Sequence, residues 1–183
     1  MFILSIRSLP LLALLLAGAI GSSGASGAQE TSHERSSRHD ILVGSVGELE
    51  FEIHYGRPKA RGRQLWGGLV PWGKVWRAGA NEATTIQVSK NARVLGNDIP
   101  AGRYSLFVIP EKTQWTFILN RVADQWGSFL YDSAEDLCRF SVETEAVDPD
   151  GPEHAEELTY SFENGQIYLA WGHLRAGFPI ESP

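Results

Sequence analysis

The residues best suited to binding or catalysis gather in one stretch, 56–82, which is rich in glycine and tryptophan. Its single acid is Glu82, and its basic residues are Arg57, Lys59, Arg61, Arg63, Lys74 and Arg77. A guanidinium can bind a carboxylate or phosphate through two parallel hydrogen bonds. Because the chain as a whole carries a formal charge of -6, this stretch predicts a local cationic surface for an anionic ligand.

The end of this stretch, WRAGANE, offers the sharpest set of polar groups. Arg77 could bind an acidic group, Asn81 could orient a hydroxyl, and Glu82 could act as a general base or accept hydrogen bonds. Gly79 lies between them and permits a backbone turn that larger residues resist. A structural alternative is that Arg77 pairs with Glu82, or with carbonyl groups at a strand end, and pins the loop.

The other basic and aromatic residues of the stretch also have two interpretations. Arg57, Lys59, Arg61 and Arg63 alternate, which could place four charges on one side of an extended segment. They could bind an anion such as a polysaccharide or a lipid headgroup, or form a solvated edge that prevents strand aggregation. The aromatic residues could provide a stacking platform for sugar rings or simply the loop's own core. They are Trp66, Trp72, Trp76 and, further along the chain, Trp126.

The composition and motifs of the chain argue against several classes of function. The acidic balance argues against a nucleic-acid partner. The five histidines have no metal-ligand spacing, so we expect no metal and no cofactor. The sequence lacks the usual serine and cysteine nucleophile motifs. The only cysteine, Cys138, alternates in phase with Phe140 and is expected to be a buried hydrophobe.

The N-terminal residues predict export. A basic residue, an apolar run of about 12 residues and a small-residue segment indicate a signal peptide over 1–28. An uncleaved anchor is the alternative, although the run is shorter than the roughly 20 residues that span a bilayer. We expect a flexible segment over 29–39, one domain over 40–183, a periplasmic or secreted location and no transmembrane span after cleavage. The sequence indicates no oligomeric state.

The sequence pattern predicts β-strands along almost the whole domain. Residues 48–55 alternate strictly between apolar and polar side chains, which is typical of a half-buried strand. Asn164-Gly165, between two further apolar runs, is a strong hairpin signal. We predict an all-β fold, an antiparallel β-sandwich or jelly roll, with a small β-barrel as the alternative. The predicted strands cover 41–46, 48–55, 84–89, a hairpin within 92–102, 104–109, 115–120, 137–142, 158–163 and 166–171, with an exposed loop over 143–157.

Five short runs follow one another along the chain: YGRP, GGLVPWGKVW, VWRAGANEATTI, AGRYSLFVIP and DQWGSFLYD. Together they resemble a bacterial exported family known as domain of unknown function 2911, over Phe51 to Val142. The resemblance implies one exported domain and no particular reaction. The matching residues include Arg57, Pro58, Gly68, Gly73, Trp76, Arg77, Gly79, Asn81, Glu82, Tyr104, Ser105, Gln125, Trp126 and Tyr131.

We therefore expect a module that binds a small polar or anionic ligand, such as a carbohydrate, in a loop-built pocket. The alternatives are a hydrolase or lyase that uses Glu82 as its acid/base group, and an envelope scaffold with a flat tryptophan-bearing patch. The candidate ligand-binding residues are Arg57, Trp76, Arg77, Asn81, Glu82, Gln125, Trp126 and Tyr131.

Overall fold

The computed structural model describes residues 37–148, 150–151 and 154–183. All of them fall in one compact unit, Glu34–Pro183, which contains every strand described below and the whole hydrophobic core that they form. The predicted signal peptide, 1–28, and residues 29–36 of the predicted flexible segment lie outside the described residues. The first strand begins at Arg38, inside the segment predicted to be flexible.

Strands account for most of the described chain, with one short 3-10 helix. They are β1 (Arg38–Val46), β2 (Leu49–Arg57), β3 (Thr84–Val88), β4 (Ala92–Val94), β5 (Asn97–Ile99), β6 (Gly102–Pro110), β7 (Gln114–Asn120), β8 (Asp136–Ala146), β9 (Ala155–Glu163), β10 (Gln166–Gly172) and β11 (Leu174–Pro179), with η1 at Ser133–Glu135.

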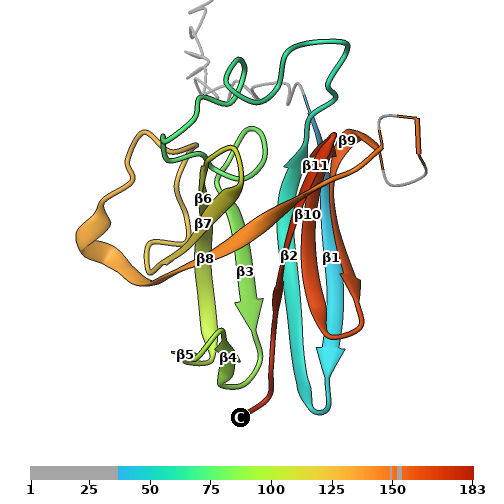
Figure 1. Cartoon of the computed structure of the whole chain (residues 1–183). Helices are drawn as coiled ribbons and strands as arrows, with labels where there is room; N and C mark the ends of the chain where they lie inside the picture. The colour runs from blue at the N-terminus through green and yellow to red at the C-terminus, as the bar shows by residue number, and fades with distance from the viewer. Residues whose placement is uncertain (1–36, 149, 152–153) are drawn as a thin grey trace, which may run out of the picture. The chain divides into compact units, whose positions relative to one another are not determined.

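Nine strands form one antiparallel sheet, in the order β1-β2-β3-β6-β7-β8-β11-β10-β9 (Figure 1). The sheet curls until its edge strands, β1 and β9, approach each other: Arg38 on β1 forms an ion pair with Glu157 on β9 at 3.8 Å. Lys59, just beyond β2, also forms a backbone bridge to Glu157. The prediction of an all-β antiparallel domain is confirmed, and the continuous, nearly closed sheet corresponds to the barrel alternative. Strands β4 and β5 form a separate hairpin.

Side-chain alternation gives the curled sheet an apolar inner face. On β2, Leu49, Phe51, Ile53 and Tyr55 are buried while the residues between them point outward. Equivalent residues of the other strands fill the interior with aromatic rings; the largest fully buried ones are Trp115, Trp171, Phe51, Phe117 and Phe178. Phe107 is also fully buried, but it packs with Ala83 and Ile118 in a separate small cluster. Burial of this apolar surface is the main term that stabilises the fold.

The predicted loop over 143–157 is partly strand, and a further strand lies beyond the last predicted one. The segment 143–157 is acidic, yet β8 continues to Ala146 and β9 begins at Ala155, and Val147 between them is buried. The C-terminal tail forms β11, which pairs with β10 and β8 and buries Phe178. The hairpin at Asn164-Gly165 is confirmed, with both residues at the positive φ angles, 52° and 78°, that such a turn requires.

Candidate functional site

The long loop 56–82 is fixed to the domain by its tryptophans. Figure 1 shows the loop leaving β2 and crossing that end of the sheet. Trp66 is buried in the main core, with its ring centroid 4.6 Å from that of Trp115. Trp76 stacks almost parallel on Trp171, at 6.0 Å and 14°. The loop therefore shares the core of the sheet, and Trp76 is half-buried at its surface.

The return of the loop toward β3 depends on close backbone packing. A Cβ on Gly56 would lie 2.1 Å from the carbonyl oxygen of Ala80, and one on Gly79 would lie 2.7 Å from Thr84 Oγ1. In the turn expected around Gly79, the left-handed residues are Ala78 and Asn81, with φ of 53° and 66°. Gly79 is thus required for close approach, and the turn around it holds Arg77 in place.

Residues of this loop line a cavity of about 530 Å³, which we call the cationic pocket. Its lining includes Trp76, Trp171, Leu69 and Ser128. One carboxylate, that of Glu157, is among the lining groups. The basic lining residues are Arg38, Arg57, Lys59, Arg61, Arg63, Lys74 and Arg77. The alternating basic residues predicted to share one side of the chain do line one cavity.

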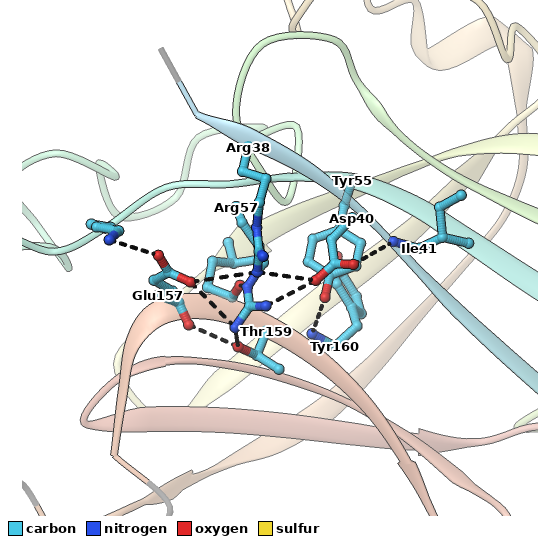
Figure 2. A network of polar contacts seen from close by, with 10 residues as sticks. Arg38, Asp40, Ile41, Tyr55, Arg57, Glu157, Thr159 and Tyr160 are labelled. Carbon is cyan, nitrogen blue, oxygen red and sulfur yellow. Dashed lines mark hydrogen bonds and ion pairs between the residues drawn. The ribbon is translucent and has the colours of Figure 1, made fainter. Parts of the chain in front are cut away.

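Arg57 connects the two edges of the sheet. Its side chain donates to Asp40 Oδ2 on β1 at 2.8 Å, to the carbonyl of Leu158 on β9 at 3.1 Å and to Thr159 Oγ1 at 3.0 Å. Figure 2 shows the guanidinium lying between the two strands. Glu157 forms ion pairs with Arg57 at 3.5 Å, Lys59 at 3.0 Å and Arg38 at 3.8 Å. Arg57 is therefore at the pocket wall, with its donors engaged by the protein.

These contacts set the charge of the two acids in the network. Burial alone would raise the pKa of Asp40, but the backbone N–H of Ile41 and the guanidinium of Arg57 together hold that pKa below its ordinary value. The Lys59 ammonium, through a hydrogen bond, does the same for the pKa of Glu157. Both carboxylates are ionised at neutral pH, so this part of the wall is close to charge balance.

Arg77 differs from Arg57 in having an unsatisfied donor. It is half-buried, and its Nε is inaccessible to solvent and has no hydrogen-bond partner among the described residues. Burial lowers the pKa of its guanidinium. Trp171 Nε1, on another residue of the pocket lining, is likewise buried and unpartnered in the described part of the chain. Buried donors without acceptors are uncommon in folded proteins, and Trp115 Nε1 in the core is a further example in the described chain.

The remaining basic residues of the pocket are exposed. Arg61, Arg63 and Lys74 are accessible to solvent, and Arg63 donates to the backbone carbonyls of Ala60 and Lys59. Within the described ranges, no carboxylate forms an ion pair with the side chains of these three residues or of Arg77. The pocket mouth thus carries a net positive charge.

Glu82 lies apart from this pocket. It lines two smaller cavities of about 190 and 270 Å³, which share Glu82, Ala83, Thr85 and Arg103 and which we call the Glu82 hollows. His39 and His54 line the smaller hollow, whereas Gln125 and Trp126 line the larger one. Arg77 and Glu82 therefore face different cavities although they are close in sequence.

The last two predicted site residues line neither the cationic pocket nor the Glu82 hollows. Asn81 is buried and donates from Nδ2 to the carbonyl of Ser37 at 3.1 Å. Tyr131 donates to Asp136 at 2.8 Å and accepts from Arg139 at 2.7 Å. Burial, followed by the hydrogen bond to Asp136, raises the pKa of Tyr131 to about 12. Both residues hold backbone or strand segments together.

Of the eight predicted residues, the structure thus brings Arg57, Trp76 and Arg77 to one cavity and Glu82, Gln125 and Trp126 to another. Sequence reasoning did not find Arg38, Glu157, Trp171 or Ser128 in the pocket wall. These residues come from distant strands and loops, and no local pattern in the sequence connects them to 56–82.

The fold and the site define a class, namely antiparallel β-domains with a loop-built cationic pocket at one end of the sheet. The family described as Protein of unknown function (DUF2911) matches residues 37–180, and the chain belongs to this family. The match is wider than the Phe51–Val142 range predicted from the motifs. Neither the search of curated proteins nor the search of solved structures found a match.

The described residues contain no helix of the length and apolar character needed to cross a membrane. In the same residues, no group of three or more histidine, cysteine, aspartate or glutamate side chains is placed to hold a metal ion.

Proposed function

We propose that this domain binds a small anionic ligand, bearing a phosphate or carboxylate group, in the cationic pocket. The observation that carries the proposal is the excess of basic groups around the cavity, with Arg77 at its wall holding a buried Nε–H that no described residue accepts. An anion there would supply a counter-charge to the guanidinium. The apolar leader predicted over 1–28 would place this activity in the periplasm or outside the cell.

The state of Arg77 supports an anion in preference to a neutral ligand. Burying a guanidinium without a counter-charge is unfavourable, which is why its pKa falls. An anion that enters the pocket would remove that penalty, whereas a neutral sugar would not. Arg57 contributes mainly by shaping the wall, because Asp40, Leu158 and Thr159 already occupy its donors.

Size and aromatic lining narrow the chemistry further. A cavity of about 530 Å³ falls within the range of small-molecule sites, roughly 300–1,000 Å³. Trp76, backed by Trp171, offers an apolar wall of the kind on which sugar rings pack. A sugar or polyol that carries a phosphate or carboxylate would use both the wall and the charges.

A thermal-shift screen at constant ionic strength tests this proposal. Sugar phosphates, uronic acids and dicarboxylates are compared with the corresponding neutral sugars. A ligand present at a hundred times its Kd should stabilise the domain by about 2.7 kcal/mol, or about 5–10 °C in Tm at this size. Arg77→Met should abolish the shift, and Arg93→Met, which removes an arginine paired with Asp98 in the β4–β5 hairpin, should not. Equal shifts with acidic and neutral sugars would contradict the proposal.

A second candidate function, acid/base catalysis by Glu82, is favoured by the larger Glu82 hollow. Thr85 Oγ1 and Gln125 Oε1 are buried there without partners among the residues described, so a polar substrate group or water could satisfy them. This function predicts that Glu82→Gln abolishes turnover of a substrate found by activity screening, while leaving the anion-dependent Tm shift intact. Unchanged turnover in that variant would exclude Glu82 as the acid/base group.

A further inference from the structure

Exposed apolar side chains gather next to the cationic pocket. The described residues include eight exposed large hydrophobic side chains, and four of them, Val122, Trp126, Phe129 and Leu130, lie on the loop between β7 and β8. Phe129 is 82% exposed and Leu130 is 75% exposed, the highest values of the eight. Single exposed apolar residues are normal on a protein surface, but two consecutive ones on a loop tip are suited to contact with an apolar phase.

This loop reaches the pocket itself. Ser128 is part of the pocket lining. At Gly127, the position of an added Cβ would lie 2.9 Å from Arg77 Nη1 and 3.2 Å from the Phe129 ring. The charged end of Arg77 and the ring of Phe129 are therefore near neighbours. Leu69, another exposed hydrophobic residue, lies on the rim of the same pocket.

Apolar side chains beside exposed basic groups match the chemistry of an anionic bilayer surface. Aromatic and aliphatic side chains enter the boundary between headgroups and acyl chains, while lysine and arginine contact lipid phosphates. Here Phe129 and Leu130 would supply the first kind of group, and Arg61 and Lys74 the second, because both cations are exposed at the mouth and form no ion pair with a described carboxylate.

We propose that the pocket mouth docks on an anionic lipid bilayer, with Phe129 and Leu130 in the interfacial layer and a phosphate-bearing headgroup in the cationic pocket. This inference rests on the proposed function and names the source of the anion. Arg77 would bind the headgroup phosphate, and the exposed cations would contact neighbouring lipids. The loop between β7 and β8 is then the part of the domain closest to the acyl chains.

Vesicle co-sedimentation of residues 34–183 tests the inference. This compact unit omits the apolar N-terminal run, and its cooperative thermal unfolding is checked first. The probes are phosphatidylglycerol vesicles, phosphatidylcholine vesicles and free glycerol 3-phosphate. We expect binding to the anionic vesicles, with a partition coefficient at least about tenfold higher than for the neutral ones. Each basic residue near an anionic surface raises the partition coefficient about fivefold.

Two sets of variants separate the apolar tip from the anion site. The double substitution Phe129→Ser and Leu130→Ser should lower partition into anionic vesicles at least about tenfold and leave glycerol 3-phosphate affinity unchanged. Arg77→Met should weaken both. The matched control is Leu95→Ser, which removes another exposed hydrophobic residue, 46% accessible, from the β4–β5 hairpin at the other end of the sheet (Figure 1); it should change neither.

The outcomes distinguish the two proposals. Glycerol 3-phosphate binding without vesicle binding would overturn the bilayer inference and leave the proposed function standing. The absence of both would overturn both. Wild-type partition by the double variant, or a change from dimer to monomer in that variant without any effect on vesicles, would show that the apolar tip has another role and would also overturn the inference.

Discussion

Removal of the Arg57 side chain should destabilise the domain strongly, because this one residue joins β2 to both edge strands. The substitution Arg57→Met keeps most of the apolar stem and removes the guanidinium. The substitution therefore removes the hydrogen bonds that the guanidinium donates to Asp40, the Leu158 carbonyl and Thr159. The Arg57 side chain is 20% exposed, so water can replace these contacts only in part.

The size of the effect follows from those contacts. A hydrogen bond to a charged group contributes about 1.5–3 kcal/mol, and the three bonds share one side chain, so their contributions do not simply add. With a discount for the partial exposure of Asp40, we expect a loss of about 3 kcal/mol in the free energy of unfolding. For a domain of this size that corresponds to a fall in Tm of about 6–12 °C.

Urea unfolding monitored by tryptophan fluorescence measures this loss. The matched control is Arg93→Met, because Arg93 pairs with Asp98 at 3.0 Å but its side chain is 45% exposed. Exposed ion pairs contribute less than about 1 kcal/mol, so this variant should unfold almost as the wild type does. A loss below 1 kcal/mol for Arg57→Met, or equal losses for the two variants, would refute the view that Arg57 closes the sheet.

Three further predictions concern the loop and the titrating groups. Gly56→Ala should lower the free energy of unfolding by more than about 3 kcal/mol in urea, since its Cβ would lie 2.1 Å from the Ala80 oxygen; an unchanged midpoint would contradict the packing described. The depressed pKa of Asp40 means that its contribution is present above the ordinary carboxyl pKa of about 3.9 and is lost as pH falls through the lower folded value. The acid-induced loss of stability should therefore be smaller in Asp40→Asn, and parallel curves for the two proteins would count against this. The raised pKa of Tyr131, about 12, means that the contribution of its neutral form is present below about pH 10 and is lost between pH 10 and 12. Unfolding of Tyr131→Phe across this range should show a shallower decline, and an identical slope would argue against the shift.

The sequence predicted most of the strands because their apolar residues alternate over many positions. It failed where that signal was absent: the acidic end of β8 carries few apolar residues, and β11 contains glycine and proline. The curl of the sheet could not be read locally either, because it depends on contacts between Arg57 and strand β9, about a hundred residues away in the sequence.

The candidate site was predicted in outline for a similar reason. The four basic residues from Arg57 to Arg63 line one cavity, although the chain turns at Arg61 and is not the extended segment that the alternation assumed. The short motif around Arg77 contains the residue with the unsatisfied donor. Spacing could not show that Glu82 turns toward other cavities, because the backbone reverses at Ala78 and Asn81 between them. Nor could it show that Asp40 and Glu157 would neutralise part of the basic wall.

The most direct test of the anion site is the proton resonance of Arg77 Nε–H, assigned by its loss in Arg77→Lys, during titration with glycerol 3-phosphate. Because Arg77 lines the cationic pocket and a bound anion would lie against its guanidinium, the account predicts a saturable shift of this resonance. Arg93, paired with Asp98 outside the pocket, should show none. A resonance of Arg77 that stays fixed up to millimolar ligand, or that moves only as much as that of Arg93, would contradict the account.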